Sequence, residues 1–90
     1  MELEGKLTEI KEIICKGTSI STKLVISESK AEKKHTIEFP GLVLADSIGH
    51  EIKYTEQRYS HWSDRHLTNI YTWKHCLVDL KINRTYIATK

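Results

Sequence analysis

The chain has 90 residues, of which 39% are hydrophobic and 29% charged, and its formal net charge is +2. This length allows one domain with a modest core, and the composition is that of a folded protein rather than a disordered one. No apolar run approaches the roughly 20 residues of a membrane-spanning helix, and the first residues, MELEGKLTE, contain no hydrophobic signal region. We therefore expect a single domain over residues 1–90, in the cytoplasm and without a membrane partner.

The charges are unevenly distributed along the chain. Residues 1–45 carry seven lysines and seven glutamates, which cancel. Residues 58–90 carry two acidic residues and six basic ones, a net charge of +4; the basic ones are Arg58, Arg65, Lys74, Lys81, Arg84 and Lys90. Any attraction to phosphate should therefore concentrate in the second half of the chain.

Residues 2–16 fit two structures. A helix would gather four aliphatic residues on one side and end before Gly17; these residues are Leu3, Leu7, Ile10 and Ile14. A long bent strand would place Leu3 and Leu7 on one face, bend sharply at Gly5, and switch Ile10 to the other face through a β-bulge. We favour the strand because the patterns that follow are those of strands.

The next segments alternate with the two-residue period of half-buried strands. In residues 20–28 one face holds Ile20, Thr22, Leu24 and Ile26, and in residues 35–39 the inward residues are His35, Ile37 and Phe39. The charged loop 29–34 joins the two into a hairpin, and Pro40-Gly41 ends the second strand. Residues 42–49 leave room for a helix of one or two turns at most.

The second half continues the β pattern. Residues 50–58 place Ile52 and Tyr54 on one face, and residues 67–74 and 75–82 are rich in residues with high β propensity. In the latter segment Cys76, Val78, Leu80 and Ile82 alternate with Leu77, Asp79 and Lys81. Asn83-Arg84 is a plausible turn before an edge strand at 85–89. The pattern predicts an all-β fold, a small antiparallel barrel of five to six strands; another barrel or sandwich, or an α+β fold with an N-terminal helix, remains the alternative.

Two short stretches carry a resemblance. Residues 3–10, LEGKLTEI, are similar to the first strand of OB-fold domains, where a glycine lets the strand curl between two halves of the barrel. Residues 47–53, SIGHEIK, resemble the entry to the fourth OB strand, with His50 where an acidic residue is usual. This resemblance implies a barrel of OB type, in which residues 58–66 form the loop between the fourth and fifth strands. OB-fold domains often hold nucleic acid with this loop.

Residues 54–75 hold five of the seven aromatic residues and two of the three arginines, whereas residues 58–66 contain no aliphatic residue. We therefore expect residues 58–66 to be a solvated loop, with Tyr54, Tyr71 and Trp73 in the core. Tyr59 and Trp62 would stack on the bases of single-stranded DNA or RNA. The phosphates would pair with basic side chains, namely Lys53, Arg58, Arg65 and Lys74.

A protein-interaction module is the alternative. Exposed Trp, Tyr and Arg side chains are enriched in binding hot spots, so the same loop could bind a protein. The strand at 85–89 could also pair with the edge of another chain, and a homodimer is one assembly that this permits.

Catalysis and metal binding find less support. His61, Asp64 and His66 are the weak metal candidates, but their spacing matches no standard zinc motif. Cys15 and Cys76 form no CxxC motif, and we expect two buried thiols in a reducing compartment, with their pairing left open. Cys76 lies beside His75 on a strand, so the two point to opposite faces and cannot act together. We therefore expect no enzyme, no cofactor and no metal.

Overall fold

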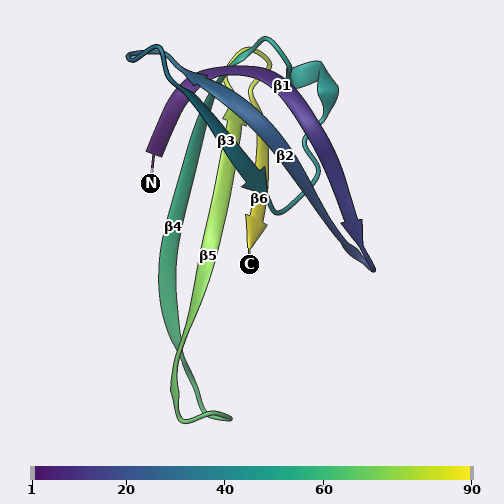
Figure 1. Cartoon of the computed structure of the whole chain (residues 1–90). Helices are drawn as coiled ribbons and strands as arrows, with labels where there is room; N and C mark the ends of the chain where they lie inside the picture. The colour runs from purple at the N-terminus through teal and green to yellow at the C-terminus, as the bar shows by residue number, and fades with distance from the viewer. Residues whose placement is uncertain (1, 90) are drawn as a thin grey trace.

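The computed structural model describes residues 2–89. Six strands form one antiparallel sheet in the order β3-β2-β1-β4-β5-β6 (Figure 1). This confirms the predicted all-β class, and residues 2–16 are a strand rather than a helix. The elements are β1 Glu2–Lys16, β2 Ser19–Glu28, β3 Lys34–Phe39, the short 3-10 helix η1 Ala45–Ser47, β4 Glu51–Ser63, β5 Thr68–Asp79 and β6 Arg84–Thr89.

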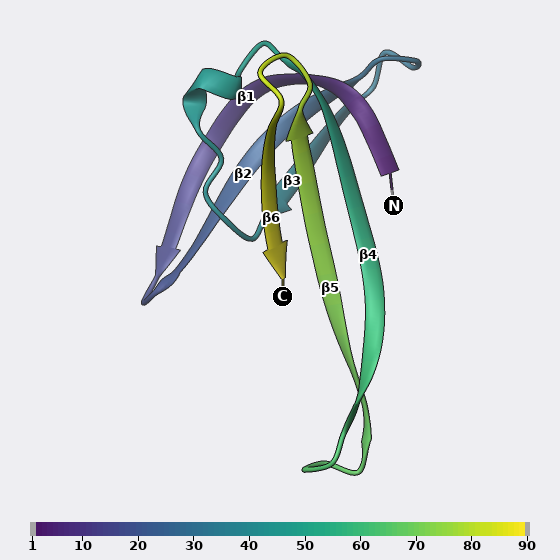
Figure 2. The same ribbon diagram turned by 180° about the vertical axis from the view of Figure 1, so that it is seen from behind.

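Strand β1 joins the two halves of the sheet. Its first residues, 2–6, pair with β4, and residues 5–16 pair with β2, so that Gly5 is hydrogen-bonded into both ladders. β1 arches over the top of the molecule in both views (Figures 1 and 2). A side chain at position 5 would overlap the carbonyl oxygen of Ser27. Only glycine therefore lets β1 and β2 approach this closely where the sheet bends, as the sequence predicts.

Two irregularities bend β1 further. The register with β2 shifts between Leu7 and Glu9 and again between Ile10 and Glu12. The first extra residue keeps Ile10 on the same face as Leu7, and Ile10 packs against the core. The predicted bulge is therefore present, but the prediction that it moves Ile10 to the opposite face is wrong.

The core lies beneath the arch of β1. Every strand except β6 contributes fully buried residues, and Tyr86 and Ala88 of β6 are partly buried against them. Ile20 lies near the tip of the β1–β2 hairpin, beyond this cluster, and is exposed although its alternation predicts an inward position. The core residues are Leu3, Leu7, Leu24, Ile26, Ile37, Phe39, Val43, Ile52, Tyr54 and Leu77.

The structure corrects the end of β5. Residues 67–74 and 75–82 are not separate units, because one strand runs to Asp79 and the turn that follows precedes Arg84. Leu77 pairs with Tyr54 and Asp79 pairs with Ile52, which places both on the core face. The apolar alternation of Cys76, Val78, Leu80 and Ile82 therefore does not mark the core: the first two are half-buried on the outer face, and the last two are exposed in the turn.

The sheet does not close through its backbone. Within residues 2–89, no ladder joins β3 to β6, the two edge strands. The segment that contains η1 lies against β6 instead, where Ser47 Oγ is 2.8 Å from the hydroxyl of Tyr86 and Arg84 donates to Asp46. The result is a barrel-like shape whose seam is held by side chains.

Cysteine placement differs from the prediction of two buried thiols. Cys15 is exposed near the tip of the β1–β2 hairpin, Cys76 is half-buried, and both are free thiols. Residues 2–89 contain no helix with the length and apolar character needed to cross a membrane.

Candidate functional site

Strands β4 and β5 extend from the core as an arm, defined here as residues 56–75, which is two-stranded beyond Lys74, where the pairing with β6 ends. The arm projects away from the body in both views (Figures 1 and 2). Its ladder runs from Ile52 paired with Asp79 to Ser63 paired with Thr68. Residues 58–66 are therefore mostly strand rather than the expected loop, and only the turn at 64–67 is irregular. Thr, Tyr, Trp and Ile have high β propensity, and the ladder supplies backbone partners without a hydrophobic core.

The front face of the arm continues the core face of β4 and β5. It presents three successive cross-strand rows, each with one aromatic ring and one side chain that can hydrogen-bond: Arg58 with Trp73, Ser60 with Tyr71, and Trp62 with Asn69. The residues Trp62, Tyr71 and Trp73 are 58%, 60% and 41% exposed.

Tyr54 is buried as predicted, but the prediction that Tyr71 and Trp73 are core residues is wrong. They lie where no third strand or layer covers the arm. The sequence contains a signal for this, because a hairpin turn at 64–67 would pair Trp73 with Arg58, which must remain solvated.

A cation lies among the rings of the front face. The guanidinium carbon of Arg58 is 4.9 Å from the ring centroid of Tyr71 and 6.0 Å from that of Trp73. Such contacts are attractive and hold Arg58 against the aromatic surface. Positive charge and flat apolar surface are thus available at one place.

A carboxylate stands at each end of the front face. At the outer end, Trp62 Nε1 donates to Asp64 Oδ1 over 3.0 Å. At the inner end, Tyr54 donates its hydroxyl proton to Glu56 over 3.1 Å, and the same hydroxyl lies 2.8 Å from His75 Nδ1. Burial, followed by the charge of Glu56, raises the pKa of Tyr54, so this phenol stays a neutral donor. The aromatic rows, with Arg58 as their cation, lie between these two acidic positions.

The predicted binding residues do not share one face. Arg58 and Trp62 are on the front face, whereas Tyr59 and Lys74 project from the back, because adjacent strand positions alternate. Arg65 is exposed in the turn.

Lys53 is also on the back side, nearer the body, where its ammonium lies 3.2 Å from Glu2 and 3.8 Å from Glu4. The hydrogen bond to Glu2 and the two negative charges raise the pKa of Lys53 and engage its charge.

The histidines near the tip do not form a metal centre in this arrangement. His61 is on the back face of the arm, whereas Asp64 and His66 are in the turn. Across residues 2–89, no group of three His, Cys, Asp or Glu side chains is placed to hold an ion. Elsewhere, His35 hydrogen-bonds to Glu28 over 3.2 Å, as an ordinary strand residue would.

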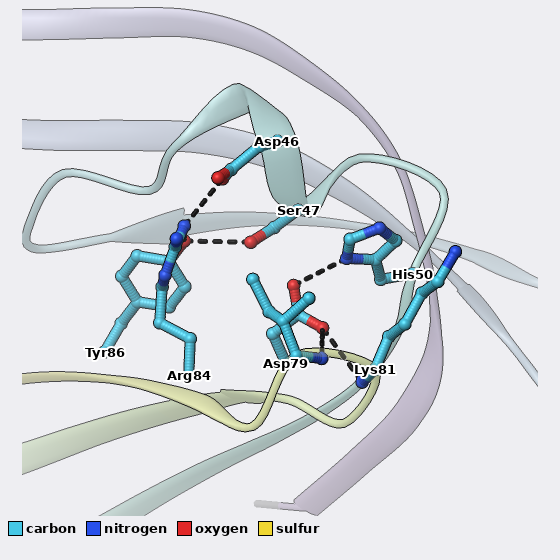
Figure 3. Close-up of polar contacts among 8 residues, drawn as sticks. Asp46, Ser47, His50, Asp79, Lys81, Arg84 and Tyr86 are labelled. Carbon is cyan, nitrogen blue, oxygen red and sulfur yellow. Dashed lines mark hydrogen bonds and ion pairs between the residues drawn. The ribbon is translucent and has the colours of Figure 1, made fainter.

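A second polar cluster, around Asp79, was not found from the sequence. The buried carboxylate lies 2.7 Å from His50 Nδ1 and accepts hydrogen bonds from the amides of Lys81 and Ile82 (Figure 3). Burial alone would raise the pKa of Asp79, but hydrogen bonds from His50, Ser47 and the two amides hold it below its usual value. A buried Asp is rarely unpaired, so this residue within an apolar strand was the available signal.

We assign the Asp79 cluster a structural role. Its hydrogen bonds fix the turn between β5 and β6 and the approach to β4, and the neighbouring pair of Arg84 with Asp46 ties the same turn region to η1 (Figure 3). Every buried side-chain polar atom among the described residues has a hydrogen-bond partner within the chain. The arm is therefore the better candidate for a binding site.

No protein-family model, curated protein or solved structure matches the chain. The geometry itself defines a small all-β domain with an exposed arm that carries aromatic rings and a cation.

Proposed function

We propose that this chain is a binding module for single-stranded nucleic acid and that the front face of the arm is its binding surface. The observation that carries the proposal is the placement of three exposed rings and Arg58 on one face. A base stacked on an aromatic side chain contributes roughly 1–3 kcal/mol, and such stacking tolerates any base sequence. Arg58 can pair with a phosphate once a base takes its place on the ring of Tyr71.

Charge gives moderate further support. The arm, residues 56–75, carries Arg58, Arg65 and Lys74 against the carboxylates of Glu56 and Asp64, a net charge of +1. A net charge of this size favours a polyanion, but it predicts a shallow dependence of affinity on salt, on the order of one to three released counterions.

We propose that this barrel-like sheet is of OB type, the fold that the sequence resembles, and the strand order supports the proposal. β1, β2 and β3 form a meander, and β1 lies between β2 and β4 as a bent strand. η1 precedes β4, and β4 and β5 form the hairpin whose connection would be the nucleic-acid-holding loop of such domains. The departure is β6, which covers the edge of β5 where the third and fifth strands would otherwise meet.

The two tryptophans of the chain, Trp62 and Trp73, both lie on the front face and serve as an intrinsic reporter. Titration with oligo-dT at low salt should quench their fluorescence, and added salt should reverse the quenching. Trp62→Ala, Trp73→Ala and the double variant should lose affinity, with the loss increasing in that order, and their circular dichroism should stay the same. Because these variants lack one or both fluorescent reporters, their binding is followed by the anisotropy of a labelled oligonucleotide. Absence of both quenching and salt-sensitive binding would refute the proposal.

Protein interaction is the second candidate, and one observation favours it. β6 is an edge strand whose outer side has no backbone ladder in the described part of the chain, and its residue Ile87 is exposed. An edge of this kind can accept a strand from another chain, including a second copy. Light scattering after size exclusion tests this. A wild-type dimer that becomes monomeric in the Ile87→Lys variant supports strand pairing at β6, whereas a wild-type monomer at all concentrations refutes the homodimer.

We also propose that the chain is a binding module rather than an enzyme. His75 and Cys76 occupy successive positions of β5, so their side chains are on opposite faces. His75 is buried against Tyr54 instead of facing a cleft.

A further inference from the structure

Resting on the proposed function, we propose that the front face holds a run of three nucleotides, one for each cross-strand row, and that Asn69 favours adenine at the outermost of them. The three rows repeat one arrangement: a ring beside a polar side chain, at Arg58 with Trp73, Ser60 with Tyr71, and Trp62 with Asn69. Each row therefore offers a surface for a base together with a group that can bond to a phosphate or a base edge.

The spacing of the rows fits an extended strand. Successive rows are two residues apart along β4, which corresponds to about 6.8 Å, and the first and third rows are about 14 Å apart. Bases that are spread to this spacing no longer stack on one another, so each can lie on its own ring.

The two carboxylates limit the length of the run. Asp64 is held at the outer end by the indole of Trp62, and Glu56 accepts a hydrogen bond from Tyr54 at the inner end. A phosphate carried beyond either end would approach a negative charge, and like charges at short range repel. On the front face, the rows between them are therefore the part that attracts a polyanion.

The polar partners divide the contacts. Arg58 in the inner row covers the ring of Tyr71 in the free protein and is the one cation on the front face of the described arm, so it takes the phosphate. Asn69 in the outer row has no charge and carries a donor and an acceptor on one amide. That pattern matches the N6 and N7 edge of adenine, whereas the hydroxyl of Ser60 in the middle row accepts either kind of edge.

The experiment uses strands of about twelve nucleotides in which only a window of one to six bases is retained and all other positions are abasic, so that the phosphate charge stays constant. Affinity should rise by about fivefold or more for each base up to the third. For longer windows it should rise only in proportion to the number of positions at which three successive bases can bind. An adenine at one end of a three-base window should bind more tightly than thymine there, and Asn69→Ala should remove that preference without changing the salt dependence. Asp64→Asn should tighten binding and move the plateau to a longer window.

Thr72→Ala, on the back face, is the matched control for Asn69→Ala and should change neither the plateau nor the preference. Affinity that keeps rising steeply beyond three bases, or an adenine preference that survives Asn69→Ala, overturns the three-row inference and leaves the proposed function standing. Binding that does not depend on retained bases at all removes the role of the rings, and with it the proposed function. A protein that binds no strand refutes the proposed function directly.

Discussion

Replacing Asp79 by alanine should be one of the most damaging single changes to stability. Its buried carboxylate hydrogen-bonds to His50 and to the amides of Lys81 and Ile82. Asp79 is fully buried, so water cannot replace these hydrogen bonds in the folded protein. Hydrogen bonds to a charged group contribute about 1.5–3 kcal/mol each. Because the turn amides can be rehydrated in the variant, we expect a loss near 3–5 kcal/mol rather than the full sum. A domain of this size has a free energy of unfolding of about 5–13 kcal/mol, so the variant should be marginal.

The measurement is urea unfolding followed by far-ultraviolet circular dichroism, because both tryptophans lie on the exposed arm and report poorly on the core. Asp46→Ala is the matched control. Asp46 makes an exposed ion pair with Arg84, which should contribute little to stability because solvent screens it. If Asp79→Ala costs less than the control, the assignment of Asp79 as the holder of the turn is wrong.

Three further predictions concern pH, the bend and the arm. The pKa of Asp79 is lower in the folded state than in the unfolded one, so its contribution is complete above about pH 4 and is lost as the pH falls further; urea midpoints should drop there, and less so in Asp79→Asn. Gly5→Ala should prevent stable folding in thermal scans because a Cβ overlaps backbone, whereas Gly17→Ala, which has open space but a φ of 60°, should cost about 1 kcal/mol; equal losses would contradict the argument. Trp73→Ala should weaken oligo-dT binding at least about fivefold. Lys53→Gln should leave the affinity within about twofold, because Lys53 is already paired on the back side. A larger loss for Lys53→Gln than for Trp73→Ala would contradict the assignment of the site to the front face.

Two-residue alternation identified most of the strands because their inner faces are apolar, but it failed on the arm. Residues 58–66 have no aliphatic side chain, and we predicted a loop from that absence. A two-stranded arm has no buried face to produce an apolar stripe, since its hydrogen bonds and cross-strand pairs are in solvent. The prediction that Tyr71 and Trp73 are buried failed for the same reason: aromatic residues are usually covered, but here the sheet is only two strands wide.

The apolar pattern also fails to predict which face of a strand points to the core where a polar group is buried. Around Asp79 the apolar residues alternate on the outer face, because the core face of β5 accommodates a carboxylate that is stabilised by hydrogen bonds. The bulge after Leu7 was expected, yet which face Ile10 would occupy depended on the pairing with β2, a contact between distant residues. For the candidate site, the sequence predicted the rings and cations of the segment but not which of them share a face.

The two-sided pairing of β1 has a consequence for the order of folding. β1 pairs with β2 across the short turn at Gly17. The pairing of Leu3 with Tyr54, in contrast, closes a long loop that contains β2, β3 and η1. Local contacts form quickly and distant ones slowly, because the entropy of closing the long loop must be overcome first. The N-terminal meander should thus appear early with its apolar underside open to water, and the slow step in refolding should be the docking of β4 against β1.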